Sequence, residues 1–506
     1  MKKCIAFALS MVMVLTLFTA CGGDSGKKES ATTGKNAQTQ TGGETQGDEG
    51  KGVAAGDMVT VNLVLPAIFT FNDADVQEVN TEINKILAEK YGVQVKLTYV
   101  NSGSWVQQTN LMLTTDEADV MCLWQTPLTT FVNNGQIIPL DDYMANASDA
   151  MKAVWTDVEL NGTRVNGTLY SITNLRNFAN DFSVQMSEEI VNELGIDITK
   201  ITDLDSLGDV LRQVKEARPD VYPIAGAQAL ITQWSWDGLG DEKFIGVLDN
   251  YGQSETVINL FESKDFRNFV DHAYEWYQEG LVMQDILSNT ESGEQLCLNG
   301  KAFAYFNNAS NAAPPAGIVR AVLLDRWAVG NSYAALSYGI SSNSKHPDEA
   351  WKLMEAIYTD KDISTFLIDG IEGMHYVVNE DGTIDYPQGL DVTSVPYGGA
   401  QQYWAFPNGG LTYPLAKNGA TFFTDLVEFN RSAISSKATG FSFDSTEVVD
   451  EYSACINVMD KYYKALMAGT LEPETAIAEA TDELMAAGLQ DIIDAKQAQL
   501  DKFLGK

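Results

Sequence analysis

Histidine is scarce in this chain, with three among 506 residues, and the motifs that position catalytic side chains are missing. There is no HExxH zinc motif and no GxSxG nucleophile turn. The stretch "SGEQLCLNGKA" is no phosphate-binding loop, because its glycines are too far apart and no serine or threonine follows Lys301. These absences argue against the enzymes that such motifs mark, and no metal or other cofactor is expected. They do not exclude a glycosidase, whose two carboxylates have no fixed spacing in a sequence.

Cysteine is also scarce, and its five positions fall into two groups. Cys4 and Cys21 lie in the N-terminal segment, whereas the other three lie in apolar stretches: Cys122, Cys297 and Cys455. Because these last three cysteines are odd in number and form no CxxC pair, the sequence argues against a disulfide framework and against a zinc site. The sequence therefore predicts three buried free thiols.

Positive charge is the third shortage. Lysine and arginine number 33 against 69 aspartates and glutamates, so the formal net charge is -36. A nucleic-acid partner would need a basic stripe to neutralise phosphates, and none is visible. An acidic body is also repelled by anionic lipid, so any attachment to a membrane must be covalent or by insertion.

The N-terminal segment carries a targeting signal. Lys2 and Lys3 precede an apolar run over residues 4–20, which is marginal for a membrane span and typical of a signal peptide. The following Cys21 resembles the acylated cysteine of a bacterial lipobox, although Phe18 stands where leucine is usual. This resemblance implies a signal peptide over 1–20 and a diacylglyceryl anchor on Cys21. Ordinary secretion and a retained membrane helix remain alternatives.

Residues 21–56 are rich in glycine, serine, threonine, glutamine and charge. Such a composition cannot bury enough apolar surface to offset its ordering entropy, so a flexible tether is predicted. A coil of this length spans roughly 30 to 35 Å. The expected location is therefore the extracellular face of a bacterial cell membrane, of the Gram-positive type.

From residue 58 onward the pattern becomes that of a globular α/β protein. Strand-like runs at 58–66, 93–100 and 118–124 alternate with helical spacings at 73–92 and 105–115. This order predicts a largely parallel sheet with helices on its faces. Later segments predict a hairpin near 160–173, a β-like run and several amphipathic helices, with a helical tail at the end. Their order suggests two lobes between which the chain passes more than once.

Several stretches resemble the family 1 extracellular solute-binding proteins of ABC importers. They are "NGTLYSIT", "WYQEGLVMQD", "NGKAFAYFNN" and "YGISSNSKHPDEAWKLMEAIYTD". The segments "IDGIEGMHYVVNEDGTIDYP" and "AGLQDIIDAKQAQLDKF" are similar to those of a lipoprotein subgroup with a characteristic C-terminal domain.

The resemblance implies a type II periplasmic-binding-protein fold, in which two α/β lobes around a hinge close on a ligand in the cleft. The expected boundaries place the first lobe at 57–168 and 309–365. The second lobe is expected at 169–308 and, together with the C-terminal helical region, at 366–506.

The function implied by the resemblance is that of a substrate-binding lipoprotein, a monomer and no enzyme, which delivers a carbohydrate to an ABC permease. An oligosaccharide is the expected ligand. Three alternatives stay open: the same fold with a peptide or another small solute, a secreted glycoside hydrolase, and an adhesin.

Sugar ligands need aromatic rings for their C–H faces and planar polar groups for their hydroxyls. Ligands of open α/β sheets lie beyond the carboxyl ends of the strands. Trp124 ends the third predicted strand, Trp105 begins the helix after the second, and Tyr170 lies near the first expected crossing.

Further candidates lie in predicted loops and at a strand end. Each aromatic has core packing as its alternative role. The candidates are Trp234, Trp236 and Asp237 in "TQWSWDGLG", Tyr403 and Trp404 in "YWAFPNGG", Asn307 with Asn308 at the end of the β-like run, and Glu372 and His375 after a helix.

Overall fold

A computed structural model describes residues 58–309 and 314–506. The predicted signal peptide, the lipidation site Cys21 and the tether lie outside the described residues. In the described part, no helix has the length and apolarity needed to cross a membrane. Two sheets, each with its own hydrophobic core, organise this part of the chain.

The first sheet has the strand order β2-β1-β3-β12-β6. β1 pairs in parallel with both β2 and β3, so the carboxyl ends of these three strands meet at one edge. β12 runs antiparallel to its neighbours β3 and β6. The strands are β1 (Thr60–Ala67), β2 (Gln94–Asn101), β3 (Val120–Trp124), β6 (Ile172–Thr173) and β12 (Leu336–Ile340).

Helices cover this sheet because each has one apolar face. On α1 the buried residues Val79, Ile83 and Leu87 recur every four positions, and the helix packs on β2 and α12. The helices of this first lobe are α1 (Asp73–Lys90), α2 (Trp105–Met112), α3 (Leu128–Asn133), α4 (Asp141–Ala145), α5 (Asp149–Lys152), α6 (Asp157–Asn161), α11 (Pro347–Thr359), α12 (Lys361–Ile368) and α13 (Phe422–Arg431).

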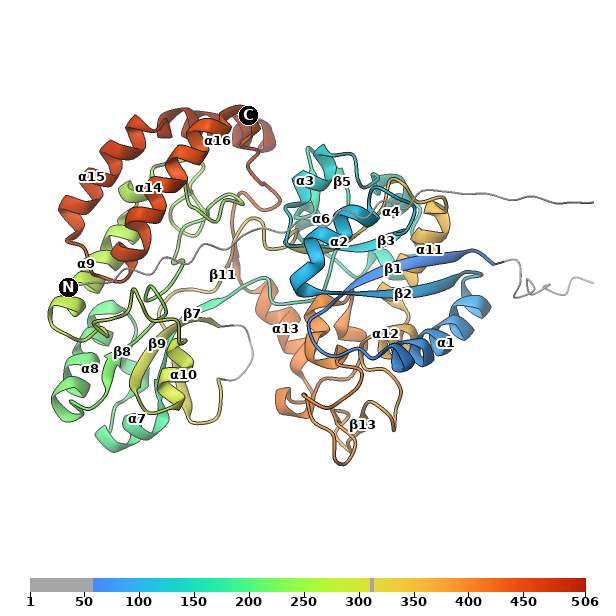
Figure 1. The fold of residues 1–506 in the computed structure, drawn as a ribbon, viewed down its shortest axis with the longest axis horizontal. Coiled ribbons are helices and arrows are strands. Elements are labelled where there is room, and N and C mark those ends of the chain that lie inside the picture. Colours follow the sequence, from blue (N-terminus) through green and yellow to red (C-terminus); the bar gives the residue numbers. More distant parts are fainter. Residues whose placement is uncertain (1–57, 310–313) are drawn as a thin grey trace, which may run out of the picture. The chain divides into compact units, whose positions relative to one another are not determined.

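The second sheet has the order β10-β7-β9-β8. β7 is antiparallel to β10 and β9, while β8 is parallel to β9. The strands are β7 (Asp181–Ser187), β8 (Tyr222–Ile224), β9 (Ala302–Ala309) and β10 (Ile318–Val322). We call this sheet and the elements packed on it the second lobe (Figure 1).

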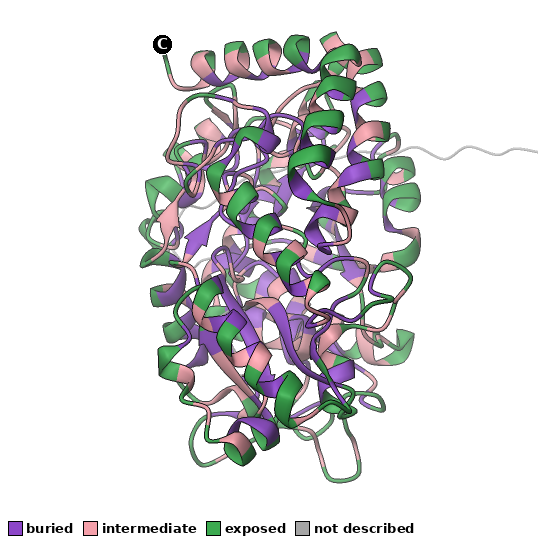
Figure 2. Cartoon of the chain, turned by 90° about the vertical axis from the view of Figure 1, so that its left-hand side faces the viewer, coloured by how far each residue is buried: buried purple, intermediate pink, exposed green. Residues whose placement is uncertain are grey.

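The C-terminal helices belong to the core of the second lobe. Helices α14 and α15 contact α9, and their apolar faces join the same cluster of buried side chains. Figure 2 shows buried turns on the inner side of the helix that ends at the C-terminus and exposed turns outward. The helices of this lobe are α7 (Glu188–Leu194), α8 (Leu204–Ala217), α9 (Lys264–Gln278), α10 (Gly293–Leu298), α14 (Val449–Met467), α15 (Pro473–Ala486) and α16 (Leu489–Phe503).

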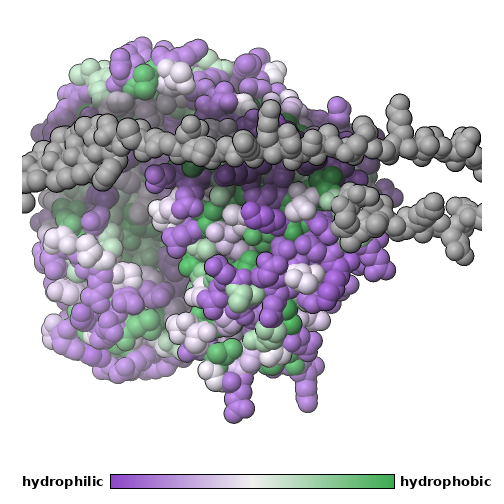
Figure 3. Space-filling view, turned by 45° about the vertical axis from the view of Figure 1, so that its right-hand side comes forward, coloured by the Kyte–Doolittle hydropathy of each residue, from purple (hydrophilic) through white to green (hydrophobic). Residues whose placement is uncertain are grey.

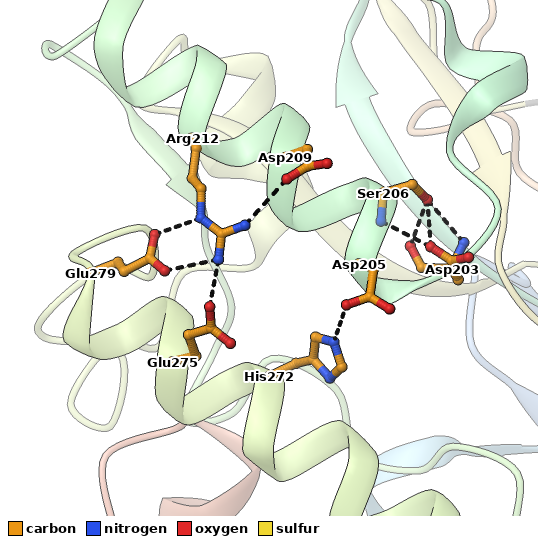
Figure 4. A network of polar contacts seen from close by, with 8 residues as sticks. All are labelled: Asp203, Asp205, Ser206, Asp209, Arg212, His272, Glu275 and Glu279. Carbon is orange, nitrogen blue, oxygen red and sulfur yellow. Dashed lines mark hydrogen bonds and ion pairs between the residues drawn. The ribbon is translucent and has the colours of Figure 1, made fainter.

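A network of charged side chains joins α8 to α9 (Figure 4). Arg212 donates to both carboxylate oxygens of Glu279, at 2.7 and 2.8 Å, and to Glu275 at 2.7 Å. The hydrogen bonds from Arg212 hold the pKa of Glu279 below its usual range. On α9, one helical turn before Glu275, Nε2 of His272 lies 3.1 Å from Asp205 of α8. The two helices are thus registered by polar contacts as well as by their apolar faces.

A buried ion pair anchors α16 to the loop that contains Asp241 and Gly246. Lys496 is fully buried, and its Nζ donates to Asp241 at 2.9 Å and to the carbonyl of Gly246 at 2.9 Å. Asp241 also accepts the hydroxyl of Tyr452 at 2.6 Å. Burial lowers the pKa of Lys496, and the charge of Asp241 opposes that shift. Helix α16 is therefore fixed to the body of the second lobe.

Within residues 58–309 and 314–506, the chain crosses between the lobes three times: between β6 and β7, between β10 and β12, and between α13 and α14. Two of the crossings pair as short strands, β11 (Trp327–Ala328) and β15 (Ile434–Ser435). The side chain of Asn430 ties the third crossing to the first, since it accepts from the Phe178 N–H and donates to the Arg176 carbonyl. The three connecting segments between the lobes are the hinge candidates.

The lobe boundaries expected from the sequence differ from these crossings. The first crossing comes after 168, because β6 still pairs with β12 in the first sheet. The return comes after 309, because β10 pairs with β7 in the second sheet. The third crossing lies near 430 and not at 366, because Leu367, Phe406 and Leu426 pack in the first core. Sequence periodicity identified the elements but not the core to which each belongs.

Smaller features agree with the sequence. Residues 164–169 form the predicted hairpin, from β4 (Arg164–Val165) and β5 (Thr168–Leu169). The three cysteines of the described part are buried free thiols, as predicted, and burial raises the pKa of Cys297 to about 12. The face drawn in Figure 3 is mostly hydrophilic, with hydrophobic side chains scattered among polar ones. A second hairpin is formed by β13 (Val377–Val378) and β14 (Ile384–Asp385).

Candidate ligand-binding site

Three of the predicted tryptophans come together at the carboxyl edge of the first sheet. The ring of Trp124 lies 6.0 Å from that of Trp105 and 6.4 Å from that of Trp404, between ring centres. Trp124 and Trp404 are half-buried, whereas Trp105 is buried. We call these three residues the aromatic edge. Two of its rings thus keep surface for a ligand, and the third supports them.

Backbone geometry fixes the central ring of the aromatic edge. Nε1 of Trp105 donates to the carbonyl of Trp124 at 3.1 Å, which joins the start of α2 to the end of β3. The next residue, Gln125, has a φ of 60°, in the left-handed region that side chains other than glycine seldom adopt. The chain therefore turns sharply after Trp124, as expected where a strand ends at a functional edge.

The loop that carries Trp404 is clamped to the end of β1 by Gln402. The side chain of Gln402 is fully buried. Its Oε1 accepts the N–H groups of Ile68 and Phe69, at 3.0 and 3.2 Å, and its Nε2 donates to the carbonyl of Pro66 at 2.7 Å. The amide thus satisfies backbone groups that β1 leaves free where it ends, and it places the neighbouring Tyr403 and Trp404. The sequence carries no signal for the role of Gln402, since a glutamine in a loop belongs to no periodic pattern.

Asn174 provides a polar group beside Trp404. Its Nδ2 donates to the carbonyl of Trp404. Its Oδ1 has no hydrogen-bond partner among residues 58–309 and 314–506, although the side chain is fully buried. A buried acceptor without a partner is costly, so a water or a ligand hydroxyl at this point would stabilise it.

Three other candidates are half-buried, as Trp124 and Trp404 are. Tyr403 packs edge-on against Phe422 and Phe423, with ring centres 5.4 and 5.3 Å away, and burial raises its pKa to about 12. Tyr170 is half-buried against the first core. Asn307 lies in the second lobe, where β9 pairs with β7, and its carbonyl accepts from Ser183.

Trp234, Trp236 and Asp237 do not line this edge. Both tryptophans are buried in the core of the second lobe, where the ring of Trp234 packs on Phe306 and that of Trp236 on Phe266. Asp237 is buried as well, and its carboxylate accepts the N–H groups of Leu239 and Gly330 at 2.8 Å each. Core packing, the alternative role, describes these three positions, because their side chains are buried although Thr232 at the start of the same segment is exposed.

Glu372 and His375 also lie apart from the tryptophans. Glu372 is exposed. His375 is buried, its Nδ1 accepts from the N–H of Ile371, and its Nε2 lies 3.0 Å from Asp75 of α1. Because Nδ1 is an acceptor, a neutral ring carries its proton on Nε2 and donates it to Asp75. The contacts of His375 thus join two parts of the first lobe.

A second aromatic group at the same sheet edge was not foreseen. Phe71 stacks on Tyr99 with ring centres 4.0 Å apart, and the hydroxyls of Tyr99 and Tyr397 lie 2.8 Å from each other. Phe71 follows β1, Tyr99 lies on β2 beside it, and an isolated antiparallel bridge with Phe71 brings Tyr397 to them. Within the described residues, no group of three or more histidine, cysteine or acidic side chains is arranged to hold a metal ion.

Comparison with known families decides the class of protein. The model of the family described as bacterial extracellular solute-binding protein matches residues 73–363, more than half of the chain. The chain belongs to the bacterial extracellular solute-binding protein family. The predicted C-terminal domain of this solute-binding protein is confirmed as well, since residues 437–505 match a domain of unknown function, DUF3502.

Individual relatives are distant but extend over nearly the whole solute-binding protein. A carbohydrate ABC transporter substrate-binding protein of Streptococcus pneumoniae is 21% identical over 443 residues, which cover 85% of this chain and 88% of that one. Among solved structures, the N-glycan transport solute-binding protein NgtS of S. pneumoniae has a TM-score of 0.77 at 20% identity, with 88% and 99% of the two chains covered. The FusA protein of S. pneumoniae, solved with kestose, has a TM-score of 0.57 at 15% identity, with 89% and 100% covered. These likenesses confirm the predicted fold class.

Proposed function

We propose that this solute-binding protein captures an extracellular carbohydrate, an oligosaccharide, and delivers it unchanged to the permease of an ABC importer. The observation that carries the proposal is the similarity, along 85% of the chain, to a carbohydrate ABC transporter substrate-binding protein. The half-buried rings of Trp124 and Trp404 support it, because such rings pack on the C–H face of a sugar. A peptide or another small solute remains the alternative ligand.

The solved relatives suggest which sugars to try first. NgtS is described in complexes with Man1GlcNAc and Man5GlcNAc, and FusA in a complex with kestose. We therefore expect a mannose-containing oligosaccharide or a fructo-oligosaccharide to raise the melting temperature of the purified protein. Ligand at a hundred times the dissociation constant stabilises the native state by about 2.7 kcal/mol.

A thermal-shift screen of these three sugars beside pooled peptides tests the proposal. A shift with at least one oligosaccharide, and recovery of that sugar uncleaved, is the expected result. A shift with peptides alone would replace the carbohydrate by a peptide ligand. Cleavage of the sugar would show an enzyme, and the absence of any shift would favour an adhesin.

We further propose that a diacylglyceryl group on Cys21 anchors the protein to the outer face of the cell membrane. The lipobox-like sequence and the tether after it support this. In cells that express Cys21→Ser, we expect the protein to move from the membrane fraction to the medium, because the serine lacks the thiol that would carry the diacylglyceryl group. Cys4→Ser is the control, and fractionation followed by immunoblotting measures both. Equal membrane retention of Cys21→Ser and the unmodified sequence would contradict the anchor.

A further inference from the structure

Two adjoining cavities lie between the first lobe and the segment 439–447 of the C-terminal domain. Their volumes are about 730 and 340 Å³, and they share the lining residues Thr129, Asn133, Ser442 and Asp444. The smaller cavity begins at Pro127, three residues after Trp124. We call the two together the polar cleft. Its first-lobe wall includes Pro127 and Thr129, on the segment that follows Trp124 and leads from β3 into α3.

The wall from the C-terminal domain is held rigidly. The backbone N–H of Asp444 donates to the side chain of Gln499 at 3.0 Å, and the Gln499 amide donates back to the Asp444 carbonyl at 2.9 Å. The ring of Phe441 packs on that of Phe503, with centres 5.6 Å apart. Because Lys496 fixes α16 to the second lobe, this wall is built before any ligand arrives.

The opposite wall comes from the first lobe and approaches closely. Asn133 at the end of α3 donates to Asp444 at 3.1 Å. Gly440 has a φ of +91°, and a Cβ there would lie 2.3 Å from the carbonyl oxygen of Asn161. A side chain at position 440 would therefore force the walls apart, so the glycine sets the width of the cleft.

The chemistry of the polar cleft suits carbohydrate. Side-chain amides line it from both walls, and Arg164, Glu447 and Lys502 add charges of both signs. Such groups bind hydroxyls in a planar and often bidentate way. Hydrogen bonds from Thr446 hold the pKa of Asp444 below its usual range, so its carboxylate is an ionised acceptor near neutral pH. Each of the two cavities has a volume within the range of small-molecule sites, which is roughly 300 to 1,000 Å³.

We infer that the polar cleft is a second carbohydrate subsite, in which the C-terminal domain binds an outer residue of an oligosaccharide whose first residue lies on the aromatic edge. This inference rests on the proposed function. It gives the C-terminal domain a role in selecting ligand length, since only an oligosaccharide that extends beyond the aromatic edge would contact its wall of the cleft. Longer sugars would gain contacts with Asn133 and Lys502.

The test compares the affinities of a short and a long sugar in the full chain. Isothermal titration with Man1GlcNAc and Man5GlcNAc is carried out on the wild type, Asn133→Ala and Lys502→Ala. Both substituted side chains are exposed, so the variants should fold. We expect each variant to weaken Man5GlcNAc binding about tenfold, as loss of one hydrogen bond to a charged or amide group does, and to change Man1GlcNAc binding less than twofold.

Lys345→Ala is the matched control, because Lys345 is exposed and does not line the cleft. The subsite alone would be overturned by either of two results in which the wild type binds sugar. In one, both cleft variants bind Man5GlcNAc as tightly as the wild type; in the other, they bind Man1GlcNAc and Man5GlcNAc more weakly by the same factor. If the wild type bound neither sugar and no sugar shifted the melting temperature in the screen, the proposed function would be contradicted, and the subsite with it. Trp124→Ala separates the two claims, since it should weaken both sugars.

Discussion

Replacing Lys496 by methionine should lower the free energy of unfolding by about 3 to 5 kcal/mol, the cost of removing one partner from a buried ion pair. The side chains of Lys496 and Asp241 are 0% and 2% exposed. Without the ammonium group, the Asp241 carboxylate stays buried with no opposite charge, and the carbonyl of Gly246 loses a donor. Urea unfolding followed by tryptophan fluorescence measures the change.

Lys502→Met on the same helix is the control for this prediction. Lys502 is exposed, so its replacement should change the unfolding free energy by no more than about 0.5 kcal/mol. In a double-mutant cycle, Lys496→Met should cost much less in an Asp241→Asn background, because the uncompensated charge is then gone. A loss below about 1 kcal/mol for Lys496→Met alone would show that the pair does not hold α16 in place.

Replacing Trp124 by alanine should weaken carbohydrate binding by about 30-fold or more, which corresponds to roughly 2 kcal/mol. Trp124 is the central ring of the aromatic edge and keeps exposed surface. The same change at Trp404 should act in the same direction. Titration calorimetry with the sugar that gives the largest thermal shift measures both variants.

A core tryptophan provides the contrast. Trp236 is fully buried in the second lobe, so Trp236→Phe should lower the melting temperature and change the affinity less than twofold. Trp124→Ala should do the opposite, with a large loss of affinity and a small loss of stability. If the two variants lose affinity to the same extent, the aromatic edge is no ligand site.

The local features of the fold could be read from the sequence. The strands that became β1, β2 and β3 and the helices α1 and α2 follow the apolar pattern, and each appears within a few residues of its predicted range. The place of Trp124 follows from that same pattern, since the apolar run of β3 ends at this residue, which is half-buried while Val120 to Leu123 are buried.

Long-range packing could not be read in this way. The loop from Gly399 to Ala405 packs on the first lobe through the Gln402 amide, and no spacing rule relates residue 402 to the end of β1. Trp234 and Trp236 have the same local signal as exposed loop tryptophans, and only the loops and helices around them make them core residues. The third crossing was misplaced for the same reason, because the segment before it packs on a sheet that lies far away in sequence.

The central claim is that this protein binds one intact oligosaccharide at the site that contains the aromatic edge. The most direct measurement is isothermal titration of the purified protein with Man5GlcNAc and with kestose, followed by chromatography of the recovered sugar. The account predicts saturable heat with one of them, a stoichiometry of one sugar per chain, and recovery of that sugar uncleaved. No heat with either sugar while a peptide pool binds, or recovery of cleaved sugar, would contradict it.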